Sequence, residues 1–231
     1  MSLSHSIIAA LPAQPTNSQA KAIDLMEQLI ERKGTNNFSL LLRGYAGTGK
    51  TTLLSALVRA IPKNQFQTVL LAPTGRAAKV MSSYSGQTAS TIHRHIYRKE
   101  SGASGGIFFS RKRNMFANTI FIVDEASMLS DDSEFGSNGL LGDLISYVFE
   151  QKNNRLILCG DTAQLPPVGK QISPALDRRY LESHFTIDLL EVELTDVVRQ
   201  AQKSGILYNA TQLRNDIRTS ATNIKFVTGF K

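Results

Sequence analysis

The stretch that decides the fold is GYAGTGKT, residues 44–51. It matches the pattern G-x-x-x-x-G-K-[ST], in which a glycine-rich turn wraps backbone N–H groups around phosphate oxygens at the start of a helix. The apolar run FSLLLRG stands before it, and the helical pattern KTTLLSALVRAI follows and ends at Pro62. A strand, a glycine-rich turn and a helix in this order predict a site for the phosphates of a nucleotide.

The residue types in this loop predict the ligand. Lys50 is expected to neutralise the β- and γ-phosphates, and the Thr51 hydroxyl is expected to hold Mg²⁺. The other predicted nucleotide contacts come from the loop and the first helical turn, and they are Gly44, Ala46, Gly47, Thr48, Gly49 and Thr52. The sequence therefore predicts a bound nucleoside triphosphate with Mg²⁺.

Three more apolar runs, QTVLLA (67–72), NTIFIVD (118–124) and RLILCG (155–160), alternate with helical patterns such as RAAKVMSSY and LLGDLISYVFE. Near-continuous apolar runs, mostly followed by helices, predict an α/β fold, a P-loop NTPase whose parallel sheet carries helices on both faces. A further helix is expected in SQAKAIDLMEQLIERKG (18–34), with Asn17 or Ser18 as its N-cap. Ligands of such sheets bind at the carboxyl ends of the strands.

Polar residues follow two of these runs. Asp124 is expected to give a second contact to Mg²⁺, and Glu125 is expected to polarise an attacking water, which favours hydrolysis over transfer to a phosphoacceptor as in a kinase. Gln164, in GDTAQLPPVG (160–169), can hydrogen-bond both a γ-phosphate oxygen and that water. Taken alone, these residues also fit a polar strand terminus and an ordinary loop ended by prolines.

Charge and composition narrow the class of protein. The chain has 231 residues and a net charge of +7, and residues 94–113 hold six Lys or Arg against one acid, Glu100. This cluster predicts an edge that binds a polyanion, although a merely solvated loop has the same composition. No run of about 18 apolar residues and no secretory signal occurs, and the single cysteine, Cys159, lies in an apolar run. We expect no membrane partner, a buried inert thiol and a cytoplasmic location.

The ordered motifs GYAGTGKTTL, APTGRAAK, TASTIHRHIY, VDEAS, GDTAQLPPVG and ELTDVVRQ, within residues 17–200, resemble the first RecA-like domain of superfamily 1B DNA helicases. The likeness is to RecD-like and Dda-like enzymes, relatives of the α subunit of exodeoxyribonuclease V. It implies an ATP-dependent 5′–3′ DNA helicase of repair or recombination, which binds single-stranded DNA and forks and can belong to a larger helicase or nuclease complex.

The same resemblance implies a domain organisation. Residues 1–231 would form the first RecA-like ATP-binding motor domain, with a small inserted DNA-facing subdomain at about 96–117. Only 31 residues follow Gln200, too few for a second domain of typical size, so the second RecA-like domain is expected to be missing. By itself such a chain is expected to hydrolyse ATP poorly and to unwind no DNA. The alternative is a stand-alone nucleotide-dependent DNA-binding module without motor activity.

The family likeness also assigns residues. It implies that Gln19 reads adenine and that Arg199 contacts the γ-phosphate, so that the expected catalytic set is Lys50, Glu125, Gln164 and Arg199. The residues implied to contact DNA are Pro73, Thr74, Gly75 and Arg76, where N–H groups and a hydroxyl can hold a phosphate, and Thr88, Thr91 and His93 along the single-strand track.

The insert GGIFFSRKR has the position of the family's duplex-splitting hairpin. There Phe108 or Phe109 can stack on a base at the fork while Arg111 and its basic neighbours hold phosphates. In the competing interpretation, both phenylalanines pack the insert against the domain.

Overall fold

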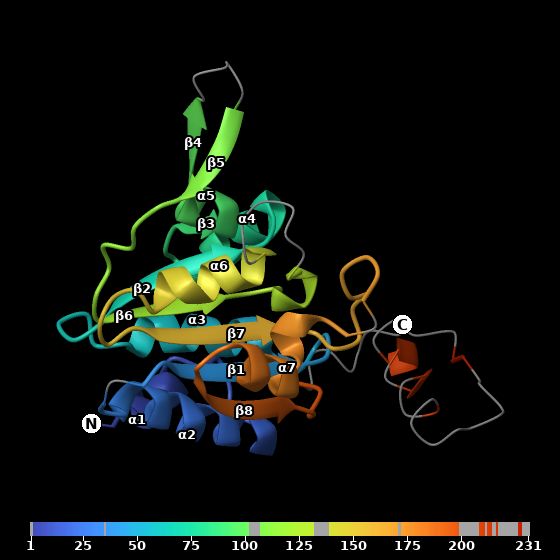
Figure 1. The fold of residues 1–231 in the computed structure, drawn as a ribbon. Coiled ribbons are helices and arrows are strands. Elements are labelled where there is room, and N and C mark those ends of the chain that lie inside the picture. Colours follow the sequence, from blue (N-terminus) through green and yellow to red (C-terminus); the bar gives the residue numbers. More distant parts are fainter. Residues whose placement is uncertain are drawn as a thin grey trace.

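The computed structural model describes residues 2–34, 36–101, 107–131, 139–170, 172–198, 208–210, 212–213, 216 and 226–227. Its centre is a six-stranded sheet in the order β3-β2-β6-β7-β1-β8, in which every neighbouring pair is parallel (Figure 1). The strands are β1 Phe38–Gly44, β2 Gln67–Ala72, β3 Ala89–Thr91, β6 Thr119–Val123, β7 Arg155–Gly160 and β8 Asp188–Leu194. The predicted parallel α/β sheet is confirmed.

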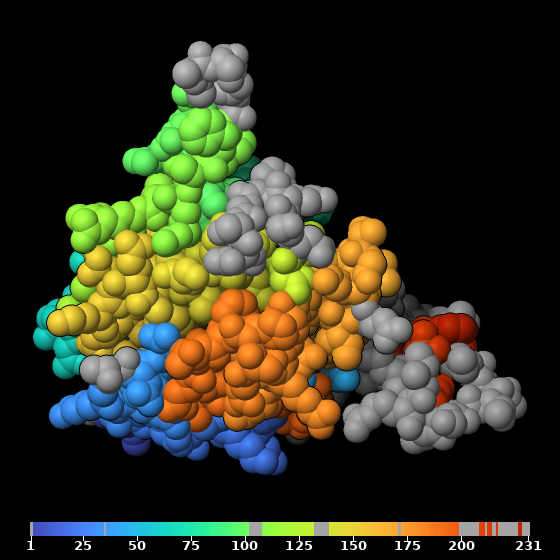
Figure 2. All heavy atoms as spheres, in the orientation of Figure 1, coloured from blue at the N-terminus to red at the C-terminus, as the bar shows by residue number. Residues whose placement is uncertain are grey.

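Helices cover both faces of this sheet. One side carries α1 Leu3–Ala9, α2 Asn17–Glu31, α3 Lys50–Ala60 and α4 Gly75–Ser85. The other carries α5 Ile92–Ile96, the short η1 Ala126–Met128, α6 Gly139–Val148, η2 Pro174–Leu176 and α7 Arg178–His184. Figure 2 shows the second face, with α6 in yellow and α7 in orange. Successive strand residues alternate between two apolar cores, since Leu40 and Leu42 of β1 join the first and Leu41 joins the second.

The start of α2 differs from the expected one. Its N-cap is Thr16, not Asn17 or Ser18, because the Thr16 hydroxyl accepts from the N–H of Gln19 at 3.3 Å and Gln19 Oε1 accepts from the N–H of Thr16 at 3.1 Å. This reciprocal pair is a capping box, which satisfies two backbone donors at once. The first turn of α2 therefore holds Gln19 in a fixed orientation.

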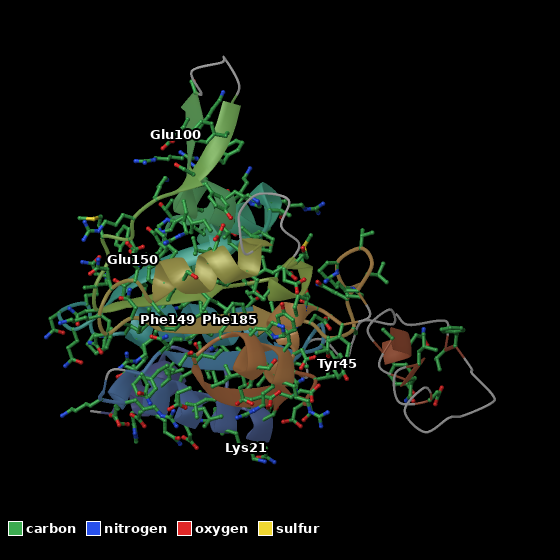
Figure 3. All side chains as sticks on the ribbon, in the orientation of Figure 1. Lys21, Tyr45, Glu100, Phe149, Glu150 and Phe185 are labelled. Carbon is green, nitrogen blue, oxygen red and sulfur yellow. The ribbon has the colours of Figure 1, made fainter. Side chains whose placement is uncertain are left out.

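Of the two forms predicted for the small insert, a loop or a β-hairpin, the structure has the β-hairpin. Strands β4 Tyr97–Ser101 and β5 Ile107–Arg111 pair antiparallel and project from the domain beyond α5 (Figure 1). At its base, Arg111 forms an ion pair with Glu150 at 2.9 Å, and Lys112 Nζ donates to the carbonyl of Arg94 at 2.8 Å. Figure 3 labels Glu100 on the hairpin and Glu150 just beyond the end of α6. Among the described helices, all are too short or too polar to cross a bilayer.

A buried arginine joins α2 to the sheet. Arg155, the first residue of β7, is 1% exposed, and its guanidinium donates to the carbonyls of Leu29 at 2.9 Å and Asn154 at 3.1 Å, and also to that of Arg32. It lies 4.8 Å from the ring centroid of Phe38. Burial lowers the pKa of Arg155. The carbonyls at the end of α2 would otherwise lack donors, so this one side chain completes the helix terminus.

We expect Arg155→Met to lower the free energy of unfolding by about 3 kcal/mol, because methionine keeps most of the apolar packing but leaves the buried carbonyls without donors. Urea unfolding followed by circular dichroism measures the loss. Arg179→Met, at an exposed position of α7, is the matched control and should change stability by less than about 0.5 kcal/mol. Equal stability of the two variants would contradict the role given to Arg155.

Candidate nucleotide-binding site

The loop between β1 and α3 has the backbone that its glycines require. Gly47 and Gly49 have φ values of 81° and 86°, in the left-handed region that glycine adopts at no steric cost. A Cβ on Gly49 would also lie 2.5 Å from Gln19 Nε2. The loop thus turns tightly onto the N-terminus of α3, where backbone N–H groups favour an anion.

Lys50, the first residue of α3, lies across this loop. Its Nζ donates to the carbonyls of Gly44 at 2.6 Å and Tyr45 at 3.0 Å, and it stands 3.8 Å from Asp161 Oδ2. Figure 3 labels Tyr45. The side chain of Thr48 is fully buried and donates to the Tyr45 carbonyl at 2.7 Å, so Thr48 shapes the loop and presents only its backbone to a ligand.

Two adjoining cavities open at this edge of the sheet. The first, of about 390 Å³, brings together the ends of three strands and is lined by Tyr45, Ala46, Gly47, Gly49, Lys50, Thr51, Thr52, Asp124, Glu125, Asp161, Gln164 and Val198. The second, of about 190 Å³, is lined by Leu11, Pro12, Ala13, Gln14, Thr16, Gln19, Gly49, Thr52 and Val198. The two share Gly49, Thr52 and Val198, so together they can hold a phosphate chain and an attached base.

Gln164 is bound directly to Glu125. Its Nε2 donates to Glu125 Oε2 at 2.9 Å, and its Oε1 accepts from the Ser127 hydroxyl at 2.7 Å. Glu125 has the left-handed φ of 55°, and its N–H donates to Asp124 Oδ1 at 2.9 Å. The hydrogen bond thus fixes the Glu125 carboxylate beside the Gln164 amide, and the backbone of Glu125 has a conformation that non-glycine residues seldom adopt. Sequence reasoning missed Ser127, although it stands inside the quoted motif VDEAS.

The environment of Asp124 suits a hard cation. The residue is 8% exposed, and burial is the main cause that raises the pKa of its carboxyl. A cation would stabilise the ionised form, and the Asp124 carboxylate with the Thr51 hydroxyl supplies the oxygen ligands that Mg²⁺ accepts. The neighbouring Cys159 is fully buried, as predicted, and burial raises the pKa of its thiol.

The segment that follows β8 closes the site from the other side. The N–H of Val198 donates to the Gly47 carbonyl at 3.0 Å. Asp196 Oδ2 accepts from the N–H and the hydroxyl of Ser18 at 2.9 and 2.8 Å, and Gln19 Nε2 donates to the Thr48 carbonyl at 2.9 Å. Three distant segments are thus joined around the loop. Arg199, the next residue, lies outside the described residues.

Of the predicted DNA contacts outside the hairpin, Thr88 precedes β3, and the others lie at or beyond the carboxyl ends of β2 and β3, at the same edge of the sheet. The Thr74 hydroxyl caps α4 by accepting from the N–H of Ala77 at 3.2 Å, and Thr91 caps α5 by accepting from Arg94 at 3.3 Å. The remaining residues of this group are the partly exposed Pro73 and His93 and the exposed Gly75, Arg76 and Thr88. Burial lowers the pKa of His93. Both threonine hydroxyls therefore already have a partner within the fold.

The hairpin presents its phenylalanines to solvent. Phe108 is 48% and Phe109 is 51% exposed, so the interpretation that both pack against the domain is wrong. In the β4–β5 register Phe108 stands opposite Glu100 and Phe109 opposite Lys99, so the two rings lie on opposite faces. Arg111 shares the face of Phe109, but its guanidinium is already paired with Glu150.

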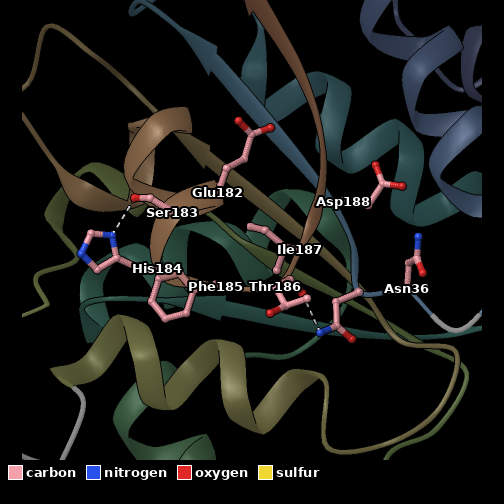
Figure 4. Close-up of a pocket in the computed structure, with 9 residues that line it drawn as sticks. Asn36, Glu182, Ser183, His184, Phe185, Thr186, Ile187 and Asp188 are labelled. Carbon is pink, nitrogen blue, oxygen red and sulfur yellow. Dashed lines mark hydrogen bonds between the residues drawn. The ribbon is translucent and has the colours of Figure 1, made fainter.

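A larger cavity of about 540 Å³ lies at the opposite edge of the sheet, by the first residues of β1 and β8 (Figure 4). It is lined by Asn36, Asn37, Glu182, Ser183, His184, Phe185, Thr186, Ile187 and Asp188. None of the predicted site residues lines it. The phosphate loop, not cavity size, therefore identifies the nucleotide site.

Comparisons with known proteins show the family of this chain. The profile of the AAA domain family matches residues 18–227. The ATP-dependent RecD2 DNA helicase of Deinococcus radiodurans is 32% identical over 193 residues, which are 80% of this chain and 24% of that protein. The ATP-dependent DNA helicase dda of Enterobacteria phage T4 is 30% identical over 204 residues, which are 87% of this chain and 42% of that protein.

A solved structure shares the fold. The crystal structure of a Pif1 helicase from Bacteroides, in complex with ADP-AlF3 and ssDNA, superposes with a TM-score of 0.53 at 22% identity, over 91% of this chain and 48% of that one. This chain spans less than half the length of these relatives. It belongs to the AAA domain family, as a RecA-like domain of the superfamily 1B helicases.

Proposed function

We propose that this chain binds ATP with Mg²⁺ and is the ATP-hydrolysing motor domain of a 5′–3′ DNA helicase of the RecD type. One observation carries the proposal: a single cavity holds the phosphate loop with Lys50 and the hydrogen-bonded pair of Glu125 and Gln164. The groups proposed to bind phosphate and to activate water therefore line one cavity, which supports the proposal. The names of RecD2 and dda, both ATP-dependent DNA helicases, support the same function.

The predicted site residues have the following proposed tasks. Lys50 neutralises phosphate charge, and Gln19 supports the base cavity. Thr51 and Asp124 hold the metal, which supplies charge stabilisation on the phosphates. Glu125 accepts a proton from the water that attacks the γ-phosphorus, with ADP as the leaving group, and Gln164 orients that water. Arg199 would add a second positive charge at the γ-phosphate.

DNA is the proposed partner. The basic hairpin and the exposed Arg76 support it, as does the single-stranded DNA bound to the Pif1 helicase from Bacteroides. Phe109 is the better candidate for a base at the fork, because it shares its face with Lys99, whereas Phe108 stands opposite Glu100. The buried thiol of Cys159 supports the proposed cytoplasmic location. Membership of a larger helicase or nuclease complex stays a prediction.

The decisive experiment is ATP hydrolysis by the complete gene product with 5′-tailed and 3′-tailed duplex DNA. We expect DNA-stimulated turnover and unwinding that depends on the 5′ tail. Nucleotide-dependent DNA binding without stimulated turnover would favour the DNA-binding module instead. Transfer of the γ-phosphoryl group to an acceptor molecule instead of to water would favour the interpretation as a kinase.

Gln164→Ala tests the water-orienting role. In the complete gene product we expect unchanged ATP affinity and a loss of about 10- to 100-fold in DNA-stimulated turnover, because the amide next to Glu125 is removed while the phosphate loop stays intact. The control is Gln65→Ala, at an exposed position before β2. Normal turnover in Gln164→Ala would show that this role is wrong.

A further inference from the structure

Tyr84, near the end of α4, reaches the nucleotide site from a helix with no predicted role there. Its hydroxyl lies 3.4 Å from Thr51 Oγ1, at the long end of hydrogen-bond distances. Its backbone carbonyl accepts from the Ser55 hydroxyl at 2.5 Å. Thr51 and Ser55 are four residues apart and so share one face of α3. Two contacts on that face thus fix the position of Tyr84.

The charges of the site also act on the Tyr84 phenol. Burial is the main cause that raises the pKa of the Tyr84 phenol, the hydrogen bond with Thr51 opposes it, and the charges of Asp124 and Glu125 add to the rise. A tyrosine hydroxyl can both donate and accept a hydrogen bond.

We propose that Tyr84 is a positioning residue of the metal site, whose hydroxyl orients the Thr51 hydroxyl and adds an outer hydrogen-bond partner. This inference rests on the proposed nucleotide and metal binding. Groups that hydrogen-bond to metal ligands fix the orientation of those ligands and raise the affinity for the metal. Thr51 and Asp124 are the two proposed protein ligands of the metal. A partner that fixes Thr51 therefore fixes one of the two.

The same helix has a second proposed contact. It begins at Gly75, capped by Thr74 and followed by the exposed Arg76, where a DNA phosphate is proposed to bind. Its buried residues Ala78 and Met81 hold it in the domain between these two ends. One helix of 11 residues therefore links the DNA side to the metal side.

Titration of Mn²⁺ in the presence of ADP, followed by electron paramagnetic resonance, tests the proposal. Tyr84→Phe keeps the ring and removes only the hydroxyl, and we expect it to weaken Mn²⁺ binding to the ADP complex about three- to tenfold. The affinity for ADP in EDTA should stay unchanged. Ser83→Ala, on the exposed side of the same helix, is the control and should behave like the unaltered chain.

Unchanged Mn²⁺ affinity in Tyr84→Phe, with normal ADP binding, would overturn the role of Tyr84 and leave the proposed function standing. Equal weakening of ADP binding with and without metal would also overturn it, because that result indicates general loosening between α3 and α4. If the unaltered chain bound neither ADP nor Mn²⁺, the proposed function would fail and the inference with it.

Discussion

Lys50→Ala is expected to abolish nucleotide binding, with ATP affinity reduced at least about 100-fold. The Lys50 ammonium is the cation that lies at the loop carbonyls and faces the cavity lined by Asp124, Glu125 and Asp161. Without it, a bound triphosphate would meet these carboxylates with no side-chain charge from the loop to offset them. Isothermal titration calorimetry with ATP and Mg²⁺ measures the change.

Two further variants sharpen that result. Lys63→Ala removes an exposed lysine just beyond α3 and should leave ATP affinity unchanged. Lys50→Arg keeps the positive charge but replaces the compact ammonium by a planar guanidinium, so its ATP affinity should lie between those of Lys50→Ala and the unaltered chain. ATP affinity that is unchanged in Lys50→Ala would overturn the assignment of the phosphate loop.

Glu125→Gln is expected to separate hydrolysis from binding. The substitution keeps the size of the side chain and an oxygen that can accept from Gln164 Nε2, so the pair should remain assembled. It removes the base that takes a proton from water, and loss of such a base lowers turnover by about 10²- to 10⁴-fold. Measurement of ATP affinity and of DNA-stimulated turnover in the complete gene product distinguishes the two effects.

The matched control for this variant is Glu31→Gln, at an exposed position at the end of α2. It should keep both affinity and turnover. If Glu125→Gln hydrolysed ATP at the normal rate, another group would have to serve as the base, and the interpretation of the VDEAS motif would be wrong.

The centre of the fold could be predicted from the sequence, and its edges could not. Strands β1, β6 and β7 are buried on both faces, so their sequences are nearly continuous apolar runs that predict strands. The edge strand β8 alternates apolar residues with Glu191 and Glu193, and β3 has only 3 residues, so neither gives that signal. Helices α1, α5 and α7, with 5 to 7 residues each, are too short for a clear helical period.

The same distinction holds for the site. Thr51, Asp124 and Gln164 could be brought together from sequence because the carboxyl ends of parallel strands share one edge of a sheet. The contact of Ser18 with Asp196 spans 178 residues and that of Tyr84 with Thr51 spans 33, and no local pattern reports either one. Thr74 and Thr91 show the opposite case, since a threonine before a helix is a recognisable cap whatever else it binds.

The hydrogen bond from Val198 to Gly47 bears on where this domain ends. A shortened protein that stopped at Leu194 would retain all six strands of the main sheet and both apolar cores. It would lose the wall that Val198 gives to both cavities and the anchor that Asp196 gives to Ser18. Residues 195–198 therefore belong to the ligand site rather than to the sheet and its two apolar cores.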